Sequence, residues 1–107
     1  MGVEMIDKVI QDLSDIFKKK NIEYKGSTKD QFRNFNQGAS LSDEMPEQVL
    51  LGYVNKQIVN LYDAKNNNPE RLTDINFIEE KAGDIAVYMI ILMAMARERN
   101  ENDQICN

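Results

Sequence analysis

The sequence predicts an all-α protein, a four-helix bundle-like domain with a long apolar C-terminal helix that self-associates. Apolar residues recur every three or four positions in three long segments, as on one face of an α-helix. Short clusters rich in Asn, Gly and Pro separate these segments and mark loops. Because 107 residues suit one domain, we expect a single helical domain at 1–100 and a disordered tail at 101–107.

The first helix is expected from about Val3 to Lys20. Three consecutive lysines, at 18–20, favour its end there because cations stabilise the negative end of a helix dipole. Its apolar residues fall on one stripe: Ile6, Val9, Ile10, Leu13, Ile16 and Phe17.

A short second helix and a longer third helix are expected next. After a break at 21–26, Ser27 or Thr28 can cap the short helix. We assign its apolar residues to the core: Phe32 and Phe35. The third helix is expected at about 45 to 65, with Pro46 in its first turn. Its apolar face comprises Val49, Leu50, Tyr53, Val54, Ile58 and Leu61.

The fourth helix is the longest and the most apolar. It follows a loop at Asn66-Asn67-Asn68-Pro69, begins at a cap supplied by Thr73 or Asp74, and continues to about Asn100. Its stretch from Ile85 to Ala96 has no polar group except one tyrosine hydroxyl. At 1.5 Å per residue this stretch spans only about 18 Å, so we expect no membrane span.

A helix that is apolar all round must be covered on all sides. Because a small chain can bury little surface, we expect the cover to come from a second copy, in a homodimer or a higher homo-oligomer. Met89, Met93 and Met95 suit such an interface. The alternative is that this helix lies at the centre of a monomer.

Composition excludes several kinds of function. The net charge of −5 and the pI near 4.7 argue against direct nucleic-acid binding, which needs a surplus of Lys and Arg. With no histidine and Cys106 as the single cysteine, His-dependent catalysis, thiolate zinc sites and disulfides are excluded. The first residues do not resemble a signal peptide, so we expect a cytoplasmic protein, in the host cytoplasm if the chain is phage-encoded.

Acidic residues at the start of the last helix are the main candidates for chemistry. Glu80 and Asp84 are four residues apart and share a helix face, with Glu79 displaced by about 100°. Asp84 leads into the apolar run, so we expect it to be partly buried and to need a cation. A pair of carboxylates suits Mg²⁺ or Mn²⁺.

A polar line on the third helix could face the same cleft: Gly52, Lys56, Asn60 and Asp63. Gly52 and Gly83 are costly in helix interiors, unless two backbones, or a backbone and a ligand, come close. The alternative is that Lys56 forms an ordinary salt bridge with Glu80 or Asp84 and that the glycines are incidental. Outside these helices, Tyr24 is a candidate for stacking on a nucleotide base.

Three stretches resemble the phage and bacterial nucleotide modification associated domain family, which is similar to the all-α, MazG-like NTP pyrophosphatases. They are residues 20–27 with Phe32, residues 56–61, and Glu79-Glu80-Lys81-Ala82-Gly83-Asp84-Ile85-Ala86-Val87-Tyr88-Met89-Ile90-Ile91-Leu92. The resemblance covers most of residues 15–95, and its most specific part is the acidic pair followed by Asp84 to Ile91.

The resemblance implies an oligomeric helical bundle that hydrolyses nucleoside triphosphates to a monophosphate and pyrophosphate with Mg²⁺. Glu80 and Asp84 would then be catalytic metal ligands supported by Glu79 and Asp63, with Lys56 on phosphate. Asn60 would support the site and Tyr24 would contact base or ribose. The chain departs from the family pattern on the third helix, which lacks an intact Glu-Glu-x-x-Glu. The alternative is therefore a non-catalytic module that captures a nucleotide or signal, or inhibits a host protein.

Overall fold

The computed structural model describes residues 2–23 and 43–106 of the chain. These residues are all-helical: α1 (Val3–Glu23), α4 (Pro46–Asn67), a 3-10 turn η1 (Pro69–Thr73) and α5 (Ile75–Cys106). The all-α prediction is confirmed for this part of the chain. The expected short second helix with Phe32 and Phe35 lies outside the described residues, as does Tyr24.

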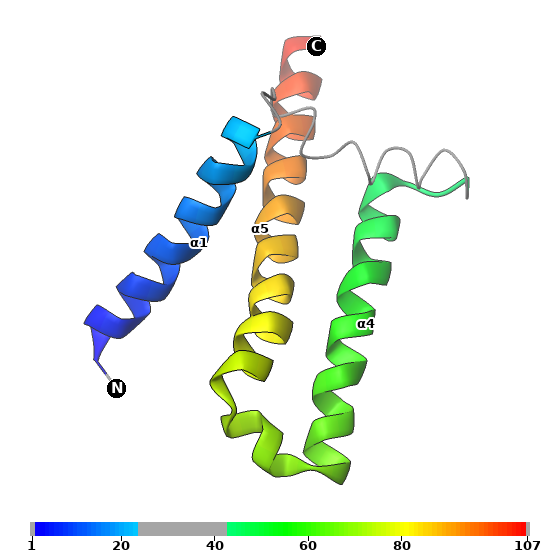
Figure 1. Cartoon of the computed structure of the whole chain (residues 1–107). Helices are drawn as coiled ribbons and strands as arrows, with labels where there is room; N and C mark the ends of the chain where they lie inside the picture. The colour runs from blue at the N-terminus through cyan, green and yellow to red at the C-terminus, as the bar shows by residue number, and fades with distance from the viewer. Residues whose placement is uncertain (1, 24–42, 107) are drawn as a thin grey trace.

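Helix α5 lies between α1 and α4, and α4 and α5 form an antiparallel hairpin through η1 (Figure 1). α1 was predicted correctly in position and ends three residues later than expected, at Glu23 rather than Lys20. Its apolar stripe is not covered. Ile6, Val9 and Ile10 remain 48%, 52% and 59% exposed.

The start of α4 agrees with the sequence prediction. Pro46 occupies the first turn, where its missing N–H costs nothing. The backbone N–H of Met45 donates to Oε1 of Gln48 at 2.7 Å, which closes the first turn. The expected loop begins later than predicted, because α4 continues through Asn66 and Asn67 and ends where the Asn68 N–H donates to the Ala64 carbonyl.

Asp74 begins α5. Its Oδ1 accepts the backbone N–H of Asn76 at 3.0 Å, whereas the Thr73 hydroxyl donates back to the Glu70 carbonyl and belongs to η1. The helix then continues to Cys106, six residues past the expected end at Asn100. Residues 101–106, which we expected to follow this helix as a tail, are part of it.

The core of the hairpin is small and consists of Leu50 and Val54 from α4 and Met95 from α5. The rings of Tyr53 and Tyr88 stack beside it with centroids 6.1 Å apart. At the open end of the hairpin, Arg99 Nη2 donates to Glu47 Oε1 at 2.9 Å. In the described ranges, no helix is long and apolar enough to cross a membrane.

The apolar run of α5 is only partly covered by the rest of the chain. Of the three methionines predicted to form a subunit interface, Met95 is buried against α4 and Met89 packs on the same core. Only Met93 is well exposed, at 57%, with Ile90 beside it at 38%. The side of α5 that faces away from α4 thus keeps an apolar surface.

Candidate functional site

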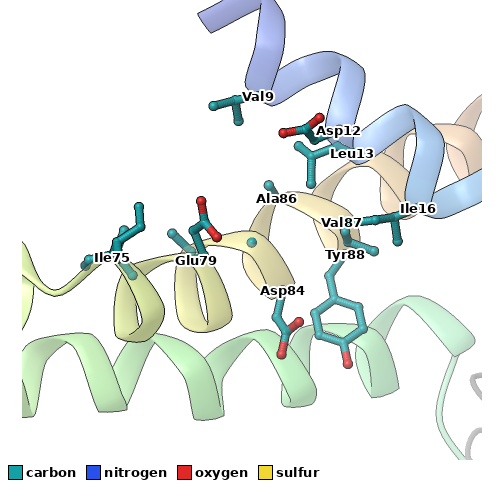
Figure 2. A pocket seen from close by; sticks show the side chains of 13 residues that line it. Val9, Asp12, Leu13, Ile16, Ile75, Glu79, Asp84, Ala86, Val87 and Tyr88 are labelled. Atoms are coloured by element: carbon teal, nitrogen blue, oxygen red, sulfur yellow. The ribbon is translucent and has the colours of Figure 1, made fainter. Parts of the chain in front are cut away.

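The acidic residues at the start of α5 point in three directions. Asp84 points towards α4, whereas Glu79 lies on the side of α5 that faces α1 (Figure 2). Glu80 is 66% exposed, and its Oε1 accepts a hydrogen bond from Lys81 Nζ at 3.2 Å. The structure therefore does not bring Glu79, Glu80 and Asp84 together.

Asp84 is held by a neutral amide. Gln57 Nε2 on α4 donates to Asp84 Oδ2 at 3.1 Å, and Gln57 Oε1 is buried with no hydrogen-bond partner in the part of the chain that the structure describes. The sequence analysis offered Lys56 as a salt-bridge partner of Glu80 or Asp84. Lys56 precedes Gln57 on α4 and is exposed, and within the described ranges no ion pair links it to either acid.

Gln57 could have been found from the sequence. It lies three residues after Val54 and seven before Ala64, both of which are buried, so it shares the inner face of α4. A polar residue on an otherwise apolar helix face indicates a partner across the interface. The polar residues that the sequence analysis assigned to a site on this helix do not include Gln57.

The predicted polar line on α4 does not form one wall of a cleft. Asn60 is half-buried, whereas Lys56, Asp63 and Gly52 are exposed. Among the described residues, a Cβ atom added at Gly52 or Gly83 would meet no atom of a neighbouring element within 4 Å. The described helices therefore do not approach each other closely at these glycines. Gly83 instead lines a cavity between α1 and α5.

The described helices do not gather the candidate metal ligands into one cluster. Within residues 2–23 and 43–106, no group of three or more acidic or cysteine side chains lies close enough to hold a metal ion. Asp84 Oδ2 accepts an amide proton, and Asp63 is exposed on α4.

Two groups of the α4–α5 hairpin have shifted pKa values. Burial raises the pKa of Tyr88, and the nearby charge of Asp84 and the neighbouring Tyr53 raise it further. The hydrogen bond from Arg99 lowers the pKa of Glu47, against the opposing effect of partial burial. Both shifts reflect contacts that hold the hairpin together.

A cavity of about 740 Å³ lies between α1 and the first half of α5 (Figure 2). Most of its lining is aliphatic. α1 contributes Val9, Asp12, Leu13 and Ile16. α5 contributes Ile75, Ile78, Glu79, Ala82, Ala86 and Val87. The volume falls in the range of about 300–1,000 Å³ that is usual for ligand sites.

The polar groups of this cavity are acidic and come from opposite walls. Asp12 on α1 and Glu79 on α5 both have their carboxylates in the space between the two helices (Figure 2). Asp84 also contributes to the lining, but its carboxylate is turned to α4. Among the described residues, the lining contains neither Lys nor Arg, so the charges that these residues contribute to the cavity are negative.

The sequence predicted the stripe of α1 but not its role as one wall of a cavity. Asp12 was not among the candidate site residues, although it directly precedes Leu13, a residue of this stripe, in the sequence. Comparison with protein-family models, with curated proteins and with solved structures gives no match to this chain. The geometry of the described helices is therefore what bears on function.

Proposed function

We propose that this protein is a non-catalytic helical binding module that takes up an elongated, largely apolar ligand along the surface between α1 and α5. The observation that supports it is the cavity between these helices, which is lined by aliphatic side chains and has acidic groups on both walls. Such a cavity, with few polar groups to orient a ligand, is the usual form of a binding site.

The apolar surface extends beyond the cavity. Val3, Ile6 and Ile10 continue the stripe of α1 towards its N-terminus and are exposed. Exposed apolar surface costs roughly 25 cal/mol for each Å² left in water, and large contiguous patches mark interaction sites. A ligand that covers α1 and α5 together would remove this cost.

Cavity filling tests this proposal. In the structure the methyl group of Ala86 points towards α1 near Leu13 (Figure 2), so Ala86→Phe places a ring in the cavity. Ala96→Phe is the matched control, because Ala96 is exposed on the same helix and does not line the cavity. We expect the uncharged fluorescent dye Nile red to bind the wild type and the control, and to bind Ala86→Phe several-fold more weakly.

Circular dichroism would verify that both variants keep their helical content. Equal dye binding by the two folded variants would contradict the proposal, as would a lack of dye binding by the wild type. In either case the cavity would not be a ligand site.

A second candidate is the nucleotide function that the family resemblance implies, as a Mg²⁺-dependent nucleoside triphosphate pyrophosphohydrolase or as a nucleotide-binding protein. The half-buried Asp84 beside the unpartnered Gln57 Oε1 supports it, because these two oxygen-bearing side chains are adjacent. Further metal ligands would have to come from elsewhere, since the described residues supply no complete set.

Incubation with mixed deoxynucleoside triphosphates and Mg²⁺ or Mn²⁺ tests this candidate. Pyrophosphate release that Asp84→Asn abolishes and Glu101→Gln preserves would support it. Glu101 is the matched control because it is an exposed acid on the same helix, away from the site. Release at equal rates from all three proteins would contradict a role for Asp84.

We also propose that the chain can self-associate as a homodimer or higher homo-oligomer. Exposed Met93 and Ile90, three residues apart on α5, support this proposal. Native mass spectrometry of the wild type and of Met93→Glu measures it. A monomeric wild type at micromolar concentration would contradict the proposal.

A further inference from the structure

We infer that the occupant of the α1–α5 surface is an amphipathic helix from another protein, with Lys or Arg at the edges of its apolar face. This inference rests on the proposed binding function and adds the class of partner. Three features of the surface support it: its length, its apolar character along both helices, and the sign of its charge.

The length of the surface suits a helix. On α1 the apolar stripe runs from Val3 to Ile16, which corresponds to about 20 Å at 1.5 Å per residue. A compact small molecule in the cavity would leave Ile6 and Ile10 uncovered, although they are 48% and 59% exposed. A helix of about 14 residues would match the whole stripe.

The opposite wall continues in the same direction. Along α5, Ile75, Ile78, Ala82 and Ala86 follow one another at spacings of three, four and four, so they share one helix face. All four line the cavity. α1 and α5 thus present two apolar stripes with a groove between them, the arrangement that receives the apolar face of a third helix.

The charge of the groove indicates a basic occupant. Asp12 and Glu79 face the same space from opposite walls, and no Lys or Arg of residues 2–23 or 43–106 lines the cavity to offset them. Once an apolar occupant excludes water, their repulsion increases because the local dielectric constant falls. Lys or Arg at the edges of the occupant would turn this repulsion into attraction and would speed association.

A second copy of the chain fits less well. Each copy has a net charge of −5, and a second α1 would bring its own Asp12 to a groove that already holds two acids. Like charges placed together across an interface are unfavourable. The charge balance therefore disfavours a second copy as the occupant of the groove.

Three synthetic helical peptides of about 14 residues test the inference. They share the same leucine positions and carry Lys, Gln or Glu on the polar face. We expect fluorescence anisotropy to show the Lys peptide binding about tenfold more tightly than the Gln peptide, and the Glu peptide more weakly than both. Added salt should reduce the difference.

Variants that neutralise the two acids test whether the groove causes the preference for the Lys peptide. Asp12→Asn with Glu79→Gln should reduce the preference for the Lys peptide to less than about threefold. The control, Asp15→Asn with Glu101→Gln, removes the same number of charges from exposed positions of α1 and α5 outside the cavity. It should keep most of the preference, so the comparison separates the groove from the overall charge.

Several results would overturn the inference. If the wild type bound all three peptides equally and Ala86→Phe bound none of them, the groove would bind helices without regard to charge. That result would overturn the inference and leave the proposed binding function standing. Binding of no peptide together with no binding of Nile red would refute the binding function itself. A wild-type homodimer that admits the Lys peptide only after Met93→Glu would show that a second copy is the natural occupant.

Discussion

The contact between Gln57 and Asp84 predicts an asymmetric response to substitution by leucine. Gln57 Nε2 donates to Asp84 at 3.1 Å, whereas Gln57 Oε1 is buried without a partner among the described residues. A hydrogen bond to a charged group contributes about 1.5–3 kcal/mol, and an orphaned buried polar atom costs about 1–3 kcal/mol. Because these terms nearly cancel and the half-buried Asp84 carboxylate can bind water in place of the amide, Gln57→Leu should change the free energy of unfolding by less than about 1 kcal/mol.

Replacement of the acceptor has the larger effect. Asp84→Leu would leave both polar atoms of the Gln57 amide without partners, so we expect it to lower the free energy of unfolding by about 1–3 kcal/mol. The double variant removes the donor, the acceptor and the Gln57 Oε1 atom together, so its free energy of unfolding should be close to that of the wild type. The two sites would then be coupled by about 1–3 kcal/mol.

Urea unfolding followed by circular dichroism measures all four proteins in one cycle. For a domain of this size, each 1 kcal/mol corresponds to a shift of roughly 4–8 °C in Tm, so thermal melts offer a second measurement. A double variant less stable than Asp84→Leu would refute the reasoning. If instead Mn²⁺ stabilised the wild type and Gln57→Leu but not Asp84→Leu, Asp84 would be a metal ligand.

Three further predictions concern the hairpin. Leu50→Ala should lower the free energy of unfolding by about 2–5 kcal/mol, because Leu50 is fully buried. Leu51→Ala is the control: Leu51 is exposed, so this change should stay below about 0.5 kcal/mol. Equal denaturant midpoints for the two variants would contradict this prediction. Gly52→Ala should raise the free energy of unfolding by about 0.5–1 kcal/mol, since the added methyl group meets open space, and a destabilised variant in the same urea assay would show that the space is filled. Finally, the raised pKa of Tyr88 means that its stabilising contribution is complete below the ordinary tyrosine pKa of about 10 and is lost as the pH rises through the raised value. An absorbance titration against Tyr88→Phe should therefore show one late-ionising tyrosine, and Asp84→Asn should bring its pKa down; a Tyr88 that ionises with the others would refute the assignment.

Local sequence signals predicted the helices well. The three-and-four spacing of apolar residues located α1, α4 and α5, and Pro46 and Asp74 marked the starts of two of them. These signals act within a few residues of the chain, so they are readable without knowing the fold. The ends were less accurate: α4 continues through two asparagines and α5 to Cys106, because a helix can outlast a run of weak helix formers when its neighbours are helical.

The candidate site was predicted less well because it depends on how each helix is rotated about its axis. Spacing placed Glu80 and Asp84 on one face, but packing against α4 half-buries Asp84 and leaves Glu80 in solvent. Residues 56 and 57 on α4 differ by about 100° in direction, and this rotation decides that the glutamine rather than the lysine meets Asp84.

Local patterns in the sequence were enough to predict the three described helices and to show that their apolar residues exceed what one hairpin can cover. Contacts between helices then establish that α4 covers one side of α5 and leaves the other side to form a groove with α1. The same contacts place Asp12 and Glu79 on two helices that face this groove. This division arises because helix formation depends on near neighbours in the chain, whereas the pairing of helix faces depends on residues far apart in sequence.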